Sequence, residues 1–154
     1  SRILQQMGPT VILPQLLGSL GSVFSKAGVG AVIASLMGSV VSEGSILAGV
    51  TIYCLAMAIF TMIMGNGFAA FAVITAGIGY PFVIAQGGNP AVVGALGLTA
   101  GFCGTLLTPM AANFNIVPAS ILEMKNKNGV ISKQVGVAVP LLAIHIVLMY
   151  FLAF

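Results

Sequence analysis

The stretch GTLLTPMAANFNIVP, from Gly104 to Pro118, decides how this chain is built, because it sets polar and helix-breaking residues inside an apolar sequence. Pro109 has no backbone N–H, and its ring clashes with the preceding turn of a helix. Thr108 is biased toward extended geometry by the proline that follows it. We therefore predict that helical hydrogen bonding is interrupted between Leu107 and Asn115.

The composition around this stretch is typical of a membrane protein. Of the 154 residues, 59% are hydrophobic and only 5% are charged, against roughly 25% charged in an ordinary soluble domain. No charged side chain lies between Glu43 and Glu123. Several apolar runs approach the roughly 20 residues that cross a hydrocarbon core about 30 Å thick. We predict an all-α integral membrane protein, with transmembrane helices, a re-entrant hairpin and a broken helix.

The apolar runs divide the chain into five segments. We place them at 3–24, 46–64, 68–85, 91–107 and 132–154, with the fourth continuing past its break to about Met124. Asn89 and Pro90 fit the N-cap and the first position of the fourth helix. We treat 1–154 as one polytopic membrane region. It begins at Ser1 without a methionine, so we expect a piece of a longer protein.

The second and third segments are joined only by Gly65, Asn66 and Gly67, all good turn formers. Two full crossings fit this pattern, and so does a re-entrant hairpin that returns to the side it came from. Nonhelical backbone at membrane depth is tolerated only where protein or water covers it. The turn chemistry favours the re-entrant hairpin, with its tip inside the protein.

A broken helix has two half-helix ends, one with free N–H groups and the other with free carbonyls. Discontinuous helices of this kind form substrate and ion sites in secondary transporters. Two polar breaks in neighbouring segments favour transport over a plain proline kink. We predict substrate contacts at Asn66, Gly67, Thr108, Pro109, Asn113 and Asn115. We predict cation contacts at Gly65, Asn66, Thr105 and Thr108.

The same residues indicate which ion is coupled to transport. No carboxylate lies between Gly44 and Leu122, and a proton route usually needs titratable groups in the membrane. We therefore expect Na⁺ as the coupling ion and no bound cofactor. The only histidine, His145, is either a functional group or a neutral histidine that hydrogen-bonds a neighbouring helix.

Other classes of function find little support in the sequence. It has no Ser/His/Asp set, paired carboxylates or metal-ligand spacing, so we do not expect an enzyme. The net charge of +3 is too small and too dispersed to suggest a nucleic-acid partner, and we expect none. Gly94, Gly97, Gly101 and Gly104 recur at spacings of three and four, which predicts close helix packing. A smooth wall beside a substrate path is the alternative.

The basic residues predict the orientation. Lys125, Lys127 and Lys133 cluster in one loop, and cytoplasmic loops carry an excess of Lys and Arg. We therefore place this loop in the cytoplasm and the C-terminus outside. The first helix then runs from Arg2 inside to Lys26 outside.

The stretches FTMIMGNGFAAFAVITAGIG (60–79) and GFCGTLLTPMAANFNIVPASILEMK (101–125) carry a family resemblance. The chain resembles, over essentially its whole length, the bacterial membrane proteins catalogued as domain of unknown function 979. It covers about the C-terminal half of a usual member. The resemblance implies one subunit of a two-component 5-oxoproline transporter of the bacterial inner membrane, partnered by a second membrane subunit of family 969. We also expect the protein to lie in the lipid bilayer and to form an oligomer there.

The arrangement is also similar to one repeat of the ion-transporter superfamily, in which hairpin tips meet an unwound helix. That similarity puts Gly65 to Gly67 at the tip and 105–115 at the unwound segment. The superfamily's tips carry hydroxyl residues beside the Asn, whereas glycines flank Asn66 here.

Two functions therefore follow from the sequence. The first is a secondary-transporter subunit that moves a small organic anion, 5-oxoproline by resemblance, with cation coupling. The second is a structural subunit that supports a transporting partner without contacting substrate. The two differ in whether Asn66 and Asn113 face a common polar cavity or face lipid and packed core.

Overall fold

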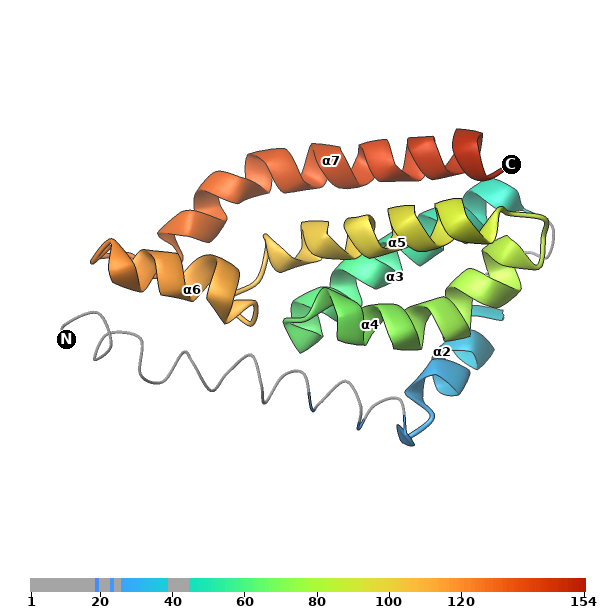
Figure 1. The fold of residues 1–154 in the computed structure, drawn as a ribbon, viewed down its shortest axis with the longest axis horizontal. Coiled ribbons are helices and arrows are strands. Elements are labelled where there is room, and N and C mark those ends of the chain that lie inside the picture. Colours follow the sequence, from blue (N-terminus) through green and yellow to red (C-terminus); the bar gives the residue numbers. More distant parts are fainter. Residues whose placement is uncertain (1–18, 20–22, 24–25, 39–44) are drawn as a thin grey trace.

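The computed structural model describes residues 19, 23, 26–38 and 45–154, and in this part of the chain it contains helices and no strands (Figure 1). Three helices there are long and apolar enough to cross a membrane: Ile46–Met64, Gly67–Ile84 and Gly129–Ala153. The all-α membrane class predicted from the sequence is therefore confirmed. Most of the helix expected over 3–24, with Arg2, lies outside the described residues.

A helical hairpin forms the centre of the fold. Its first arm is α3 (Ile46–Met64), and its second arm is α4 (Gly67–Ile74) continued by η1 (Thr75–Ile84). Gly65 ends α3 with a φ of 68°, and its N–H donates to Thr61 O at 2.7 Å. That left-handed conformation suits a residue without a Cβ, so the two arms turn back within two residues.

The second arm is α-helical near the tip and π-helical farther away. η1 contains Pro81, which has no N–H to donate, and beyond it Ala85 N bonds Tyr80 O five residues back, at 2.8 Å. A π pattern is a recognised response to an interrupted α-helical ladder. Gly77 lies against Gly30 of α2 (Val29–Gly38), and Gly79 lies against Tyr53 of α3.

The fourth segment begins as predicted. α5 (Pro90–Thr105) has Asn89 as its N-cap, whose side chain accepts from Ala91 N at 3.0 Å, and Pro90 in its first turn. Its glycines pack on α3: Gly97 meets Tyr53, and Gly104 meets the backbone of Ala58. A side chain at either glycine would collide with α3, so the predicted close helix packing is confirmed for these two positions.

The break also lies where the sequence predicts it. α5 ends at Thr105, and α6 (Ala112–Ile121) begins after six intervening residues. The unwound part is shorter than the predicted 105–115, because Thr105 still belongs to α5 and because Asn113 and Asn115 lie in the first turn of α6. α6 ends at Ile121 instead of about Met124, and α7 (Gly129–Ala153) begins three residues before the predicted start at 132.

The helices share one buried core. Tyr53 and Met57 of α3, Ile74 of α4 and Met149 of α7 are all fully buried in it. α7 lies along α5 (Figure 1), and Asn89 N donates to Ala153 O at 2.9 Å, which joins the start of α5 to the end of α7.

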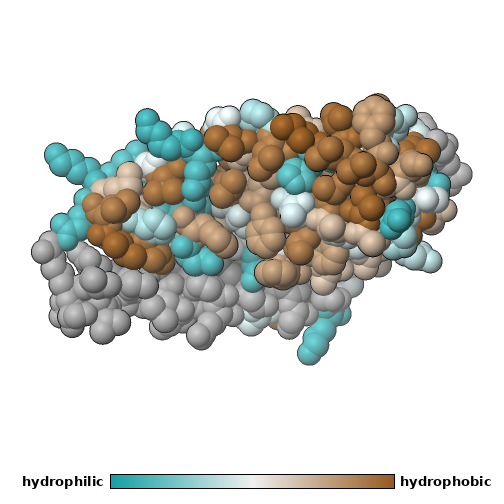
Figure 2. Space-filling view, turned by 45° about the horizontal axis from the view of Figure 1, so that its top comes forward, coloured by the Kyte–Doolittle hydropathy of each residue, from teal (hydrophilic) through white to brown (hydrophobic). Residues whose placement is uncertain are grey.

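The outer surface of α7 is apolar. Val137, Ile144, Val147 and Phe151 are more than half exposed there, and Figure 2 shows brown side chains across this face with teal ones gathered toward one end. Soluble monomers rarely expose a contiguous apolar surface of this kind. The chain has the features of a membrane protein.

Candidate functional site

The hairpin tip and the break in the fourth segment meet at one cavity. In Figure 1 the connection between α3 and α4 lies next to the connection between α5 and α6. A cavity of about 230 Å³ lies between them. The hairpin tip and the helices α4, α5 and α6 supply its lining, which consists of Gly65, Asn66, Gly67, Phe68, Phe102, Thr105, Asn113 and Phe114.

The tip contributes a capped helix N-terminus. Asn66 Oδ1 accepts from Phe68 N at 2.9 Å and from Ala69 N at 3.2 Å. An N-cap of this type satisfies two of the N–H groups that a helix start leaves without partners. Gly65 and Gly67 are buried, and Asn66 is half-buried. The acceptor of Asn66 is thus used within α4, and its amide nitrogen is the group left for a ligand.

The other side of the cavity contributes an uncapped helix N-terminus. α6 begins at Ala112, and no side chain caps it, since its N-cap position is Ala111. Asn113 in this first turn is exposed, and its side-chain amide bonds no other residue within the described part of the chain. The partial positive charge of α6 and an available amide therefore face the same space.

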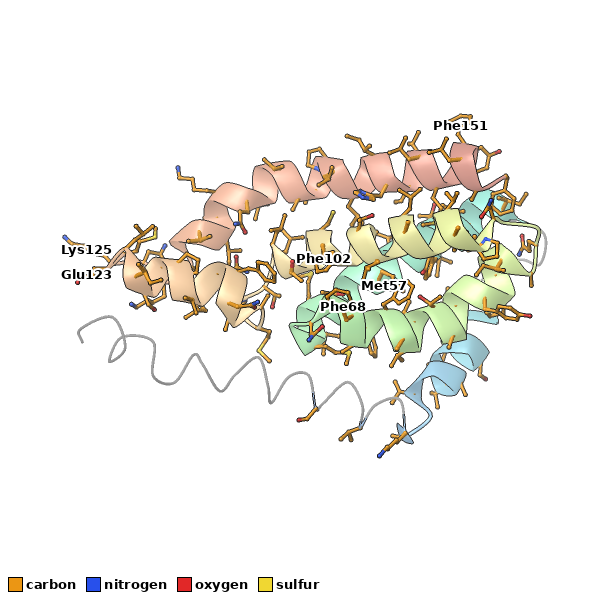
Figure 3. All side chains as sticks on the ribbon, viewed as in Figure 1. Met57, Phe68, Phe102, Glu123, Lys125 and Phe151 are labelled. Atoms are coloured by element: carbon orange, nitrogen blue, oxygen red, sulfur yellow. The ribbon has the colours of Figure 1, made fainter. Side chains whose placement is uncertain are left out.

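Aromatic side chains form the rest of the lining. Phe68 of α4 and Phe102 of α5 point toward one another (Figure 3), with ring centroids 5.6 Å apart in an edge-to-face arrangement. Phe114 of α6 completes the set. Sequence analysis missed these three, although Phe68 and Phe114 directly follow the predicted contacts Gly67 and Asn113.

Thr105 and Thr108 differ in their access to the cavity. Thr105 lines it, and its hydroxyl donates to Phe102 O at 2.6 Å. Thr108 lies outside the lining and is 4% exposed. Its hydroxyl donates to Met62 O at 2.9 Å and accepts from Met110 N at 3.1 Å.

Asn115 and Pro109 also lie outside the lining. Asn115 is fully buried, and its Nδ2 donates to Thr105 O at 2.7 Å and to Thr108 O at 2.6 Å. Pro109 is exposed in the unwound part. Of the predicted substrate contacts, Asn66, Gly67 and Asn113 are therefore brought together at the cavity. Of the predicted cation contacts, Gly65, Asn66 and Thr105 line the cavity.

His145 lies away from this site on α7 and bonds its own helix. Its Nδ1 is 2.8 Å from Leu141 O, and the bond requires the proton on Nδ1. Within the described residues, the bond to a neighbouring helix that one of the two alternatives predicted is not found, and the ring bonds the carbonyl one turn earlier instead.

Comparison with known proteins identifies a family. A family model described as "Protein of unknown function (DUF979)" matches residues 1–154. No curated protein and no solved structure matches the chain.

Proposed function

The chain belongs to the family of proteins of unknown function DUF979, and we propose that it is a secondary-transporter subunit that moves a small organic anion with cation coupling. One observation carries the proposal: Asn66 of the hairpin tip and Asn113 of the broken helix line the same cavity. A purely structural subunit is expected to turn these amides toward lipid or packed core instead.

The chemistry of the cavity suits a carboxylate. Helix N-termini attract anions through the helix dipole and bind them through free N–H groups. The first turns of both α4 and α6 contribute to the lining, and α6 is the helix without a side-chain cap. The amide of Asn113 adds a donor for a carboxylate oxygen. Phe68, Phe102 and Phe114 suit the apolar part of a small ring. These features fit 5-oxoproline, which joins a carboxylate to a lactam ring and which the family resemblance implies.

A coupling cation is part of the proposal for an energetic reason. Moving one negative charge inward against a negative-inside potential costs roughly 2.3 kcal/mol per 100 mV. We propose Na⁺ because oxygen atoms are the ligands that the site offers, at the backbone carbonyls of Gly65 and Asn66 and at the hydroxyl of Thr105. No carboxylate lies in the sequence between Glu43 and Glu123 that could carry a proton instead.

The proposal includes an arrangement in the bacterial inner membrane. α7, at 25 residues and about 1.5 Å per residue, is long enough to cross the bilayer. The hairpin tip stops beside the break, whereas α6 continues beyond it (Figure 1). This supports a re-entrant hairpin whose tip lies within the membrane. We further propose that a second membrane subunit, of the family 969 type, covers the open side of the cavity.

The test is counterflow of radiolabelled 5-oxoproline in proteoliposomes that contain both subunits. We expect saturable counterflow, and a rise of about tenfold or more in KM for Asn113→Ala, since a hydrogen bond to a charged group contributes about 1.5–3 kcal/mol. Asn126→Ala, in the loop between α6 and α7, is the matched control and should leave KM unchanged. Absence of counterflow, or equal KM values for the two variants, would count against the proposed site.

The coupling ion is tested in the same vesicles with an imposed sodium or proton gradient. Sodium should drive uptake when no proton gradient is present. Full uptake on a proton gradient without sodium, abolished by His145→Ala, would assign coupling to His145 instead.

A further inference from the structure

We propose that Thr108 and Asn115 are positioning residues, which fasten the break to the hairpin and hold the two helix N-termini of the cavity at a set separation. The inference rests on the proposed function. It differs from the sequence-based prediction, which made both residues substrate contacts, because neither side chain lines the cavity.

Thr108 joins the break to the hairpin. Its hydroxyl donates to Met62 O at 2.9 Å, across 46 residues of sequence. Met62 lies in the last turn of α3, three residues before the tip glycine Gly65. The same hydroxyl accepts from Met110 N, so one side chain fixes the path of the unwound backbone and ties it to the hairpin beside the tip.

Asn115 joins the two halves of the broken helix. Its Nδ2 donates to Thr105 O, at the last residue of α5, and to Thr108 O in the unwound part. Asn115 itself lies in the first turn of α6. The buried amide of Asn115 therefore donates both of its hydrogens to carbonyls that the break leaves without helical partners.

Together the two residues form a continuous chain of hydrogen bonds, Asn115 to Thr108 to Met62. It runs from the start of α6 to the end of α3, next to the two helix starts that line the cavity. Leaving carbonyls without a hydrogen-bond partner in an apolar environment has a free-energy cost. The chain of bonds removes that cost and fixes where α6 starts relative to α4. Substrate affinity then depends on Thr108 because it fixes the position of α6 relative to α4, and not because it touches the substrate.

The test compares Thr108→Val, which keeps the shape and removes the hydroxyl, with Thr108→Ser, which keeps the hydroxyl. In counterflow of 5-oxoproline we expect Thr108→Val to raise KM at least threefold while the maximal rate per folded protein changes less. Thr108→Ser should stay close to wild type. Thr99→Val is the matched control, because the Thr99 hydroxyl donates to carbonyls of its own helix, Ala95 O and Leu96 O.

A second measurement does not depend on transport. Phe68→Cys and Phe114→Cys place one thiol on each side of the cavity, in a protein with Cys54→Ala and Cys103→Ala. A short bifunctional thiol reagent should cross-link this pair efficiently, less efficiently with Thr108→Val, and efficiently again with Thr108→Ser. If Thr108→Val does not fold, Thr108→Ala replaces it.

The outcomes separate the two proposals. Equal cross-linking and equal KM for the Val and Ser variants would overturn the positioning role. Cross-linking that depends on the hydroxyl, in a protein that shows no counterflow of 5-oxoproline, would support the positioning role and count against the proposed transport.

Discussion

At the scale of single residues, Asn66 shows how one side chain serves both fold and site. Its Oδ1 accepts two backbone N–H groups at the start of α4, so this oxygen is occupied before any ligand binds. Its amide nitrogen is the part that can meet an anion in the cavity. Capping and binding therefore use different atoms of Asn66, and substitutions can separate them.

Asn66→Ala should destabilise the protein by about 1 kcal/mol through loss of the cap and should also weaken anion uptake. Asn66→Asp keeps an oxygen for the cap, so it should retain stability, but its negative charge should weaken uptake strongly. A thiol-reactive dye can follow thermal unfolding, since Cys54 and Cys103 are buried in the folded state.

Asn89→Ala provides the control for Asn66. Asn89 is the N-cap of α5 and does not line the cavity. The substitution should therefore lower stability while uptake per folded protein stays unchanged. If Asn66→Asp transported as well as wild type, the amide nitrogen would have no role in binding.

At the scale of elements, the contact between α3 and α5 holds the hairpin against the broken helix. Gly97, Gly101 and Gly104 let α5 approach α3 closely, because side chains at these positions would meet Tyr53, Met57 and the backbone of Ala58. Small residues allow this approach in membranes, where packing drives helix association. The position of the break relative to the hairpin tip depends on this contact.

Gly104→Ala should destabilise the protein by about 1–3 kcal/mol, since a methyl group there collides with backbone that cannot move aside easily. Gly136→Ala is the matched control: nothing lies within 4 Å of the added Cβ on α7, and alanine favours a helix by up to about 1 kcal/mol over glycine. Thermal unfolding of both variants measures the difference. Equal stability would show that α5 does not need this approach.

At the scale of the whole molecule, charged side chains gather at one end of the long axis, and apolar side chains cover α7 toward the other end. Glu123 and Lys125 project at the end formed by α6, and Phe151 lies on the outer side of α7 near the C-terminus (Figure 3). The turn between η1 and α5 lies with the C-terminus at the opposite end (Figure 1), because Asn89 bonds Ala153. The two ends of the molecule can therefore be assigned to the two sides of a membrane.

We predict that the loop after α6 faces the cytoplasm and that the turn after η1 faces outside. Asn126→Cys and Gln86→Cys, each in a protein without Cys54 and Cys103, test this with an impermeant thiol reagent. In right-side-out vesicles Gln86→Cys should react and Asn126→Cys should not, and inverted vesicles should reverse the result. Labelling of both positions from one side would contradict the topology.

Much of the fold follows from the sequence by itself, because local chemistry decides where helices start, break and turn. Pro109 has no backbone N–H to donate, so the helix breaks beside it whatever the rest of the chain packs against. Asn89 and Pro90 start α5 through contacts within one turn. Gly65 closes the hairpin through its left-handed conformation, and Asn66 does so through the side chain that caps α4. The apolar runs locate α3 and α7 because a membrane selects length and hydrophobicity.

Only the tertiary structure decided which predicted residues meet. Asn66 and Asn113 reach one cavity, whereas Thr108 and Asn115 turn to backbone carbonyls, one of them 46 residues away. The aromatic lining was likewise not predicted. The physical reason is that a polar side chain bonds whichever unsatisfied group lies within about 3 Å. That neighbour is set by the packing of helices distant in sequence, which local patterns do not encode.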